Sequence, residues 1–584
     1  MLLTALLLSL ANAGPGHQRR ALSLPPFESR SGKQHKITVE MPDGVGLDTR
    51  VHLPAGEGPW PVIFIRNPYP MGPILDRDCS LYVRYGFACV WQMVRGRGDS
   101  GGEWAPFIHE RADGLAALDW ILAQPWSSDS IGMTGPSYLG GVQWAMVGAL
   151  PPEVKTIVPM VFGVDMYANT YEGGLFRHEL VGTFVTLIPD SGFYMLGGSR
   201  YQDALRHRPR RELDEVATGE VVEWTAPWMD AQLKSDAYWQ SEQVQMITTA
   251  PEVIDIPVLL IGGWSDAFLS SQLDTWQRLA SRPESTLVIG PWDHLGRSAG
   301  DLALNNVDDE TGLEDSYFQV ARVIDWMSHH LKGTPARYPV GKALTYVTND
   351  DRWAVRDAWP PPTEPLRFSL LAGDADHCAA PLSADAPAGP DETASYTYDP
   401  SDSTPSLGGA GSLAAVLPSF KGVPPGFVDQ GRLCSEREDL LGWVTPPLEA
   451  PLHIAGSVTA TLAVSSSAPD TAFNVRILDL QPDGTLVHVR EGIRALSFRD
   501  GDSTRSPYVI GDTVSITVET WPVEYVFQPG SQVMVQVASA SFPKFEAHSN
   551  TLVYWADAVE VVSAEQTIHL SASSVELPVV TDLR

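Results

Sequence analysis

The hexapeptide GPSYLG at residues 135–140 constrains the fold more than any other stretch, because it places one serine, Ser137, between glycines. Residues 130–134 before it are apolar enough for a buried strand, and residues 142–150 after it can form a helix without proline or charge. A serine on such a strand-to-helix turn is held in a strained, exposed position, with its Oγ above the sheet edge. The sequence therefore predicts a nucleophile elbow, the turn that carries the serine of acyl-enzyme hydrolysis.

The spacing of this motif differs slightly from the usual pattern. A nucleophile elbow reads G-x-S-x-G, whereas here the second glycine comes one residue later. A glycine-rich turn without chemistry is the alternative interpretation. The elbow also requires an acid and a base later in the chain, in the order Ser, Asp, His.

Two further strand patterns end in candidates for that acid and base. Residues 257–263 form an apolar run that ends just before Asp266, and residues 285–289 form another that ends before His294. Functional groups of an open parallel sheet gather outside the carboxyl ends of its strands, so Ser137, Asp266 and His294 are predicted to meet at one edge. His294 would take the proton of Ser137, and Asp266 would fix and stabilise the imidazole.

Each of these residues also has a structural interpretation. Asp266 precedes a predicted helix over residues 267–279 and could cap it. Asp293 is a rival acid, but its position next to His294 makes it a poor partner for the ring nitrogen. His294 stands out among 14 histidines because it follows a strand end downstream of both partners.

Several motifs in register give the chain a resemblance to a known family. They are RNPY at 66–69, RGRGDSGG at 95–102, the hexapeptide at 135–140, GWSD at 263–266 and GPWDH at 290–294. In these the chain resembles the cocaine esterase and X-Pro dipeptidyl-peptidase (CocE/NonD) family of serine hydrolases, which also contains α-amino acid ester hydrolases and glutaryl acylases. The resemblance implies an α/β-hydrolase core with Ser137 as nucleophile, Asp266 as acid and His294 as base.

The same resemblance implies an oxyanion hole made from the Tyr69 hydroxyl and the Tyr138 backbone N–H. The amide that follows the nucleophile points at the developing oxyanion, which agrees with this role for Tyr138. Tyr69 follows the apolar run at residues 61–65, so it also comes just past a strand end. The alternative for Tyr69 is a packed aromatic residue in a proline-flanked turn.

The expected substrate is the ester or amide of a small molecule, and release of X-Pro dipeptides is the second reading. Acylase and α-amino acid ester hydrolase activities are less favoured. By resemblance, the α-amino acid ester hydrolases hold the substrate amine with clustered carboxylates, and residues 171–178 contain no paired aspartates. Glu172 could still recognise an amine, although an exposed helix cap is the simpler interpretation. The candidate pocket residues are Trp264, Glu172, Phe176 and Trp292.

A second glycine motif suggests a rival class of enzyme. Residues 96–101 fit G-x-G-x-x-G after a strand-like run, as in dinucleotide-binding proteins. However, Asp99 inside the loop and Glu103 just after it would repel a pyrophosphate. We therefore expect no cofactor, and the absence of Cys-x-x-Cys or histidine-rich spacing predicts no metal site.

Length and charge narrow the remaining classes. A chain of 584 residues suggests two or three domains, and 40 basic against 71 acidic residues give a net charge of −31. This balance disfavours nucleic acid and anionic membranes as partners. No stretch after the N-terminus is long and apolar enough for a membrane span, and a homo-oligomer stays open.

The N-terminus and the cysteines point to export. Residues 1–13 combine an apolar core with Ala-x-Ala, which predicts a cleaved signal peptide and a secreted or periplasmic protein, although no basic residue precedes the core. The alternative is a start-site artefact or a packed N-terminal helix. Four cysteines allow three pairings. Pairing Cys378 with Cys434 would close a long loop and contribute about 4 kcal/mol, whereas Cys89 equally fits a buried free thiol.

Composition changes along the chain divide it into segments. Strand and helix patterns alternate over residues 14–165 and 251–355, which predicts the catalytic α/β domain. Strand patterns vanish over residues 166–250, which we expect to form a helical cap above Ser137. Residues 356–584 show short β-branched runs between Gly/Pro turns, as in a β-sandwich. By resemblance this is a jelly roll that packs on the hydrolase domain, with a lectin-like module as the alternative.

Overall fold

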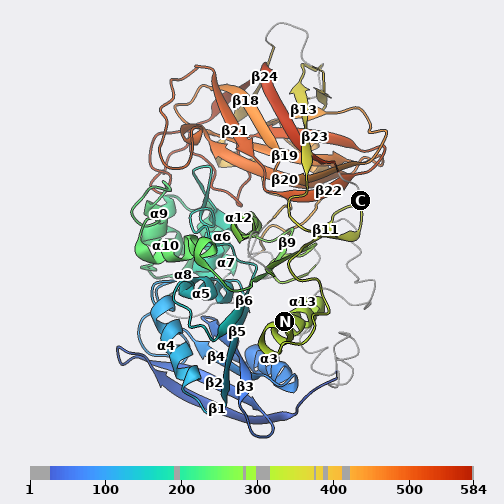
Figure 1. Cartoon of the computed structure of the whole chain (residues 1–584). Helices are drawn as coiled ribbons and strands as arrows, with labels where there is room; N and C mark the ends of the chain where they lie inside the picture. The colour runs from blue at the N-terminus through green and yellow to red at the C-terminus, as the bar shows by residue number, and fades with distance from the viewer. Residues whose placement is uncertain are drawn as a thin grey trace.

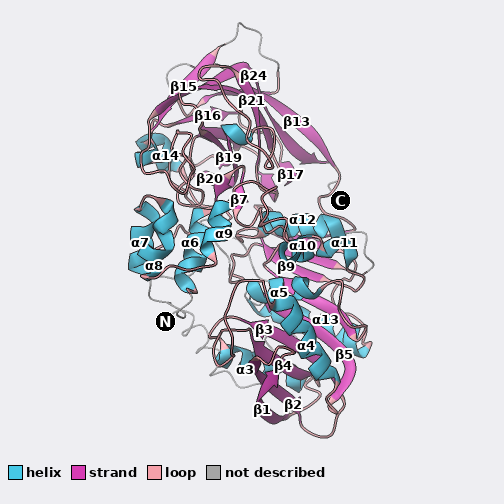
Figure 2. Ribbon diagram, turned by 90° about the vertical axis from the view of Figure 1, so that its left-hand side faces the viewer, coloured by secondary structure: helices cyan, strands magenta, loops and turns pink. Residues whose placement is uncertain are grey.

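The computed structural model describes residues 26–189, 198–279, 284–297, 316–373, 377–385, 392–410 and 421–581. An α/β domain and a β-rich domain lie at opposite ends of the molecule, and a group of helices lies between them on one side (Figures 1 and 2). This confirms the predicted fold class. The predicted signal peptide at residues 1–13 lies outside the described residues.

A 10-stranded sheet, in the order β1-β2-β4-β3-β5-β6-β9-β10-β11-β12, forms the centre of the α/β domain. Its inner strands, from β4 to β11, run parallel, whereas β1, β2 and β12 are antiparallel additions at the edges. The strands are β1 (Ser31–Glu40), β2 (Gly46–Pro54), β3 (Trp60–Asn67), β4 (Ala88–Met93), β5 (Ser127–Pro136), β6 (Val154–Met160), β9 (Leu259–Gly263), β10 (Thr286–Gly290), β11 (Ala343–Val347) and β12 (Arg352–Arg356).

The inner strands are apolar because helices cover both of their faces. Every residue of β4, β9 and β10 is buried. The covering helices are α3 (Gly72–Arg84), α4 (Glu110–Leu122), α5 (Tyr138–Met146), α12 (Leu269–Leu279) and α13 (Ser316–Lys332). The helix predicted over residues 142–150 therefore begins and ends four residues earlier. It stops at Met146 because Val147 is extended and Gly148 has a φ of 85°.

The segment between β6 and β9 forms the helices that lie between the two domains. They are α6 (His178–Leu187), α7 (Gly198–Arg206), the 3₁₀ turn η1 (Arg210–Glu212), α8 (Leu213–Thr218), α9 (Thr225–Asp230), α10 (Glu242–Thr248) and α11 (Ala250–Val253).

One strand pair also lies in this segment, which corrects the expectation that strands vanish there. It is the hairpin of β7 (Tyr171–Glu172) and β8 (Leu175–Phe176). Its turn uses Gly173 and Gly174, with φ of 53° and 82°. A Cβ on Gly174 would lie 2.2 Å from the ring of Phe498, so only glycine fits there.

The C-terminal domain is β-rich, and its strands form two groups that meet through β13 and β14. The long strand β24 pairs with β13, β15, β17 and β18 in one group, while β20, β19, β23 and β16 follow one another in the second. The jelly-roll topology stays a prediction. The elements are β13 (Thr363–Leu370), β14 (Ala380–Ser383), β15 (Thr393–Tyr398), η2 (Pro400–Asp402), α14 (Gly431–Glu436), β16 (Leu440–Val444), β17 (Leu452–Gly456), β18 (Thr459–Ser466), β19 (Ala472–Leu480), β20 (Leu486–Ala495), η4 (Leu496–Phe498), β21 (Val514–Glu519), β22 (Val523–Phe527), β23 (Gln532–Ala538) and β24 (Ala564–Val580).

A buried carboxylate, Glu524 of β22, ties the two domains together. On the α/β side, the Thr345 hydroxyl donates to it at 2.6 Å and the Arg356 guanidinium at 2.5 Å. His453 of the β-rich domain lies 3.2 Å away on the other side. The side chain of Glu524 is fully buried, so the charge depends on partners from both domains.

Disulfides join Cys79 to Cys89 and Cys378 to Cys434. The second pairing is the one that the sequence favours. The first differs from the free-thiol interpretation of Cys89, because helix α3 packs on β4 and brings Cys79 within 5.3 Å of Cys89, Cα to Cα. Sequence spacing alone does not reveal this helix-to-strand contact.

Candidate active site

Ser137 occupies a sharp turn between β5 and α5. Its φ of 58° and ψ of −127° are a strained combination for a residue with a side chain. The Ser137 N–H donates to the carbonyl of Met160 at 2.8 Å, and its own carbonyl accepts from the Gly140 and Gly141 amides. The turn therefore has the backbone geometry of the predicted elbow.

Glycine is required at two positions around this turn. Gly135 has a φ of 154°, and a Cβ there would lie 2.4 Å from that of Leu139. A Cβ on Gly141 would lie 2.6 Å from the ring of Phe107. Close packing of the strand, the helix and a neighbouring aromatic ring explains the glycines.

Asp266 and His294 form a hydrogen-bonded pair beyond the ends of two neighbouring strands. Gly263 and Gly290, the last residues of β9 and β10, pair in register. His294 Nδ1 lies 2.5 Å from Asp266 Oδ2, and the Phe268 N–H donates to Asp266 Oδ1 at 2.7 Å. Both oxygens of this fully buried carboxylate are thus used, and one of them orients the imidazole.

Ser137 and the pair lie at the same edge of the sheet. Met160 of β6 pairs with Pro136 on one side and with Ile261 on the other. The Phe268 ring, which lines the hollow that holds Ser137, lies 5.5 Å from the His294 ring, centroid to centroid. The carboxyl ends of β5, β9 and β10 therefore bring the predicted acid, base and serine to one region.

Asp293, the rival acid, serves its own turn instead. Its Oδ1 accepts from the Leu295 and Arg297 amides at 2.8 and 3.0 Å, and its Oδ2 accepts from the Arg297 guanidinium. These bonds hold the carboxylate in the turn that carries His294.

Tyr69 and Tyr138 converge at the elbow. Asn67 fixes the turn of Tyr69, because its Oδ1 accepts from the Tyr69 N–H at 3.1 Å. Burial raises the pKa of the Tyr69 hydroxyl to about 12, although hydrogen bonds with the Ser137 side chain and the Tyr138 backbone oppose this rise. The hydroxyl is thus protonated at neutral pH and lies beside both the serine and the amide that follows it.

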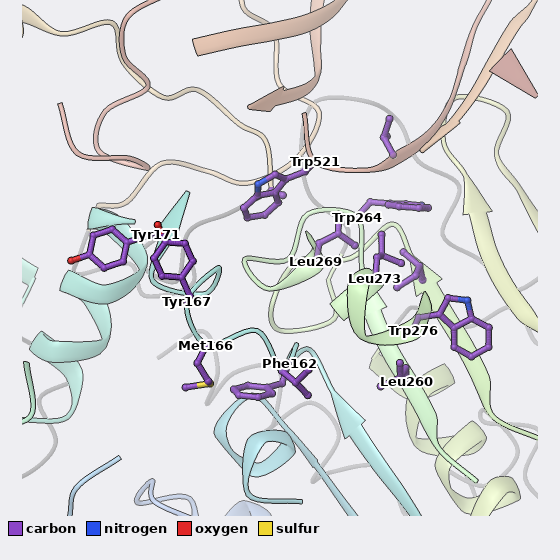
Figure 3. Packing of buried hydrophobic residues seen from close by; sticks show 14 of the residues in the cluster. Phe162, Met166, Tyr167, Tyr171, Leu260, Trp264, Leu269, Leu273, Trp276 and Trp521 are labelled. Atoms are coloured by element: carbon purple, nitrogen blue, oxygen red, sulfur yellow. The ribbon is translucent and has the colours of Figure 1, made fainter. Parts of the chain in front are cut away.

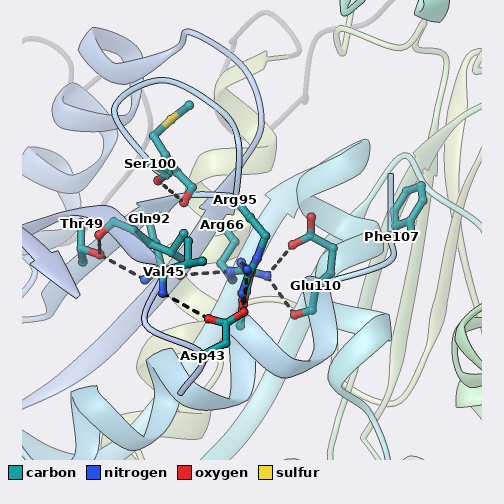
Figure 4. Close-up of polar contacts among 12 residues, drawn as sticks. Asp43, Val45, Thr49, Arg66, Gln92, Arg95, Ser100, Phe107 and Glu110 are labelled. Atoms are coloured by element: carbon teal, nitrogen blue, oxygen red, sulfur yellow. Dashed lines mark hydrogen bonds and ion pairs between the residues drawn. The ribbon is translucent and has the colours of Figure 1, made fainter. Parts of the chain in front are cut away.

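A buried polar network reaches the residue that follows Ser137, and Figure 4 shows Arg66, Arg95 and Glu110 of this network. The Tyr138 hydroxyl donates to Glu110 at 2.8 Å and accepts from the Phe107 N–H at 3.0 Å. Glu110 also pairs with Arg66, and Arg95 next to them binds Asp113 through two hydrogen bonds. The arginines of two sequence motifs therefore have a structural role, which is to hold α4 under the serine.

A hollow of about 500 Å³ opens in front of Ser137. Among the described residues its wall is mostly apolar, and none of those that line it is a lysine, arginine, aspartate or glutamate. The lining residues are Tyr69, Phe107, Ser137, Tyr138, Phe162, Met166, Asn169, Thr170, Leu180, Val181, Phe184, Trp228 and Phe268.

The four candidate pocket residues do not line this hollow. Trp264 and Trp292 are packed in the core, with relative exposures of 0% and 2%. Phe176 is buried against the Trp555 ring at 4.5 Å. Glu172 lies in the β7–β8 hairpin rather than at an exposed helix cap, and its carboxylate accepts from the Trp521 indole.

The actual lining residues carry a weak sequence signal. Phe162, Met166 and Asn169 follow β6, and Phe184 and Trp228 belong to the cap helices. The aromatic content of the cap was the one sequence signal for these residues. It does not tell which side of each cap helix faces Ser137, because that depends on tertiary packing. Asn169 is 6% exposed and donates to the Gly163 carbonyl, while its Oδ1 is buried without a protein partner.

The G-x-G-x-x-G segment forms a turn, and no helix begins until Glu110. A dinucleotide motif would need a helix N-terminus at that point, so the nucleotide interpretation loses its structural basis. Arg97 of this segment instead donates to the carbonyls of Ile188 and Pro189 at 3.1 and 3.0 Å, which ties the segment to the end of α6.

One group of potential metal ligands occurs among the described residues. Glu284, His329 and His330 bring ligand atoms within 4.8 Å of one another. Glu284 precedes β10, so this group lies at the sheet edge opposite His294 and away from the hollow at Ser137. Within the described part of the chain, no helix has the length and apolar character needed to cross a bilayer.

Comparisons with known proteins agree with this arrangement. Residues 43–296 match the family model described as X-Pro dipeptidyl-peptidase (S15 family). Residues 339–575 match the X-Pro dipeptidyl-peptidase C-terminal non-catalytic domain. The cocaine esterase of Rhodococcus sp. (strain MB1 Bresler) is 30% identical over 548 residues, which cover 88% of this chain and 92% of the esterase.

Solved structures share the fold over both domains. An aminopeptidase from the marine sediment archaeon Thaumarchaeota archaeon superposes with a TM-score of 0.80 at 21% identity, over 95% of this chain and 98% of that one. An α-amino acid ester hydrolase gives a TM-score of 0.78 at 23% identity, with the same coverage. The shared domains and the full-length similarity together show that this chain belongs to the cocaine esterase and X-Pro dipeptidyl-peptidase (CocE/NonD) family of serine hydrolases.

Proposed function

We propose that the protein hydrolyses the ester or amide of a small molecule through an acyl-serine intermediate. The observation that supports this most is the 2.5 Å bond between His294 and Asp266, at the same strand ends as the strained Ser137. Ser137 Oγ attacks the substrate carbonyl as its proton passes to His294 Nε2, and His294 then protonates the leaving group. Water attacks the acyl-serine by the same route and releases the acid.

The proposed oxyanion hole consists of the Tyr69 hydroxyl and the Tyr138 N–H. Both groups already contact each other beside Ser137, so an oxyanion placed between them would accept two hydrogen bonds. Tyr69 keeps its proton for this purpose, because burial raises the pKa of its hydroxyl to about 12.

The apolar hollow favours a substrate with a neutral, apolar acyl or leaving group. The described residues of its wall offer aromatic rings and no charged side chain, so a protonated amine bound against them would lose water without gaining a counter-ion. This favours neutral esters over substrates with a free α-amino group.

The test is a matched pair of aryl esters with equal chain length, one neutral and one carrying a terminal ammonium group. We expect kcat/KM to be at least about 100-fold higher for the neutral ester, as for a charge buried without a partner. Equal values for the two esters would contradict the proposed substrate class. A fluorophosphonate probe should also label Ser137, as mapped by mass spectrometry.

X-Pro dipeptide release is the second candidate, favoured by the family model that matches residues 43–296. Such a peptidase must bind a protonated N-terminus, and the lining of the hollow supplies no carboxylate. Hydrolysis of Xaa-Pro anilides faster than neutral aryl esters would favour this candidate.

We also propose that the protein works in an oxidising compartment after export. Two disulfides pair all four cysteines, and such bonds persist outside the cytosol. Cell fractionation with N-terminal sequencing tests this, with the expected mature chain beginning after Ala13. A cytosolic protein with reduced thiols would contradict it.

A further inference from the structure

The turn that carries Asp266 is held on both sides by buried guanidinium groups. Arg490 Nη2 donates to the Trp264 carbonyl at 2.7 Å, and Arg177 Nη2 donates to the Ala267 carbonyl. Trp264 and Ala267 enclose Asp266 in the sequence. We call these two arginines the acid-turn clamp.

Arg490 reaches this turn from β20 of the β-rich domain. It is fully buried, and its other hydrogen bonds go to the carbonyls of Pro522 and Val489, both at 3.1 Å. Burial lowers the pKa of Arg490 to about 9, so the guanidinium still carries its charge at neutral pH. A buried cation satisfied by carbonyl oxygens is costly, which argues for a positional role at the turn.

Arg177 joins the same turn to the wall of the hollow. Its Nη1 donates to the Ala168 and Asn169 carbonyls at 3.2 and 3.4 Å, and Asn169 lines the hollow at Ser137. Burial lowers the pKa of Arg177 to about 10, while the carboxylates of Glu172 and Asp266 favour its charged form. Arg177 is thus a cation beside the buried Asp266.

The β-rich domain also holds Arg177. The Arg177 guanidinium lies 4.8 Å from the ring centroid of Trp521, whose indole N–H donates to Glu172. Figure 3 shows Trp521 descending from the β-rich domain toward the loops that carry Tyr171 and Trp264. Lys544 Nζ lies 4.6 Å from the same ring centroid and donates to Glu491 at 2.9 Å.

Both arms of the clamp therefore lead to one strand, since Arg490 and Glu491 are neighbours in β20. We propose that Arg177 and Arg490 are positioning residues for Asp266, and that through them the β-rich domain sets the orientation of the His294 imidazole. This rests on the proposed catalytic triad. Neither arginine lines the hollow, so neither is expected to touch the substrate directly.

The experiment compares Arg177→Lys and Arg490→Lys with Arg476→Lys as the matched control. Arg476 in β19 is equally buried and bonds the Pro405 and Ala540 carbonyls of the β-rich domain. It also pairs with Glu491 at 3.6 Å, so this control disturbs the β20 end of the network without a bond to the acid turn. Lysine keeps the charge but loses the forked geometry. We expect kcat to fall roughly 10- to 100-fold in the two clamp variants, as for a displaced catalytic group, with KM and the control nearly unchanged.

A second readout separates positioning from stability. The downfield proton resonance of the His294 Nδ1–H, held by Asp266, should shift or broaden in the clamp variants and persist in Arg476→Lys. Thermal midpoints identify any variant that fails to fold. Trp521→Phe is a milder change, because it keeps an aromatic ring beside Arg177 and removes only the indole N–H that bonds Glu172.

The outcomes distinguish this inference from the proposed function. If Ser137→Ala abolishes turnover while folded clamp variants keep a normal kcat and a normal downfield resonance, the clamp is overturned and the triad stands. If the control loses as much kcat as the clamp variants, the effect belongs to the β-rich domain in general, which also overturns it. If Ser137→Ala stays active, the proposed function itself fails.

Discussion

The elbow at Ser137 and the turn at Asp266 lie at the same sheet edge but are built in different ways. The backbone of Ser137 is held by β5, α5 and the adjacent strand β6, all within 25 residues. The turn at Asp266 is held by Arg177 and by Arg490, which lie 90 and 226 residues from their acceptors. Local packing therefore holds Ser137 in its strained turn, whereas the turn of the proposed acid is held by groups from distant parts of the chain.

This difference has a consequence for how each part responds to change. Changes close to Ser137 should disturb the elbow most, because its turn is held by close contacts such as that between Gly135 and Leu139. The acid turn can be disturbed from another domain without altering the serine. The following predictions test the two parts separately, beginning with the largest effect.

Replacing the serine should have the greatest effect. Ser137→Ala removes the attacking oxygen, and kcat should fall by roughly four to six orders of magnitude. Steady-state assays with a neutral aryl ester measure the loss, and circular dichroism checks folding. Near-normal turnover in a folded variant would refute the elbow as a catalytic feature.

Asp266→Asn tests the acid turn and should cost about 10⁴ in kcat, because the amide favours the wrong imidazole tautomer. Asp293→Asn is the matched control, since Asp293 bonds its own turn and Arg297. We expect the control to lose less than about ten-fold, because the bonds of this buried carboxylate stay within its own turn. The reverse ranking would make Asp293 the acid.

Tyr69→Phe probes the group that joins the two parts at the oxyanion position. Loss of one oxyanion donor should lower kcat by about 10²–10³. KM should change little, because the ring stays in the wall of the hollow. The same assay series measures both constants, and an unchanged kcat would return Tyr69 to a packing role.

Glu172→Gln should have the smallest effect, which is a change in how the free energy of unfolding depends on pH. Burial raises the pKa of Glu172 from its ordinary 4.5 to about 7, so the folded protein keeps a proton that the unfolded chain has released. This contribution is full below about pH 4.5 and is lost as pH rises through 7, so the free energy of unfolding falls by roughly 1–3 kcal/mol over that window.

In Glu172→Gln this part of the fall in the free energy of unfolding with rising pH should disappear. Urea titrations at several pH values measure it, with Tyr171→Phe as a control that leaves the carboxyl in place. An unchanged slope would mean that Glu172 is ionised in the folded protein throughout this range.

Much of the arrangement around the elbow could be predicted from the sequence. The apolar runs at 257–263 and 285–289 correspond to β9 and β10, and the α/β class with a β-rich C-terminal domain is confirmed. These features follow from short-range patterns, namely apolar runs closed by glycine and residues just past strand ends. The helix after Ser137 begins and ends four residues earlier than predicted, because Gly148 ends it and the sequence periodicity there is weak.

The contacts between distant segments could not be predicted in this way. Trp264 and Trp292 were expected in the pocket because they adjoin the acid and base, yet they pack into the core. Arg177 and Arg490 carry no local pattern that points to the acid turn. Their acceptors are backbone carbonyls, which every residue has, so only the three-dimensional arrangement identifies the partner.

Glu524 limits how this protein can be recombined with its relatives. Its carboxylate is bonded by Thr345 and Arg356 of the α/β domain and by His453 of the β-rich domain. In a chimaera that takes its β-rich domain from a relative, the donors of both domains must therefore match this carboxylate. Otherwise a buried negative charge is left without partners. A crossover point within the cap is therefore a better choice for engineering than one between the α/β domain and the β-rich domain.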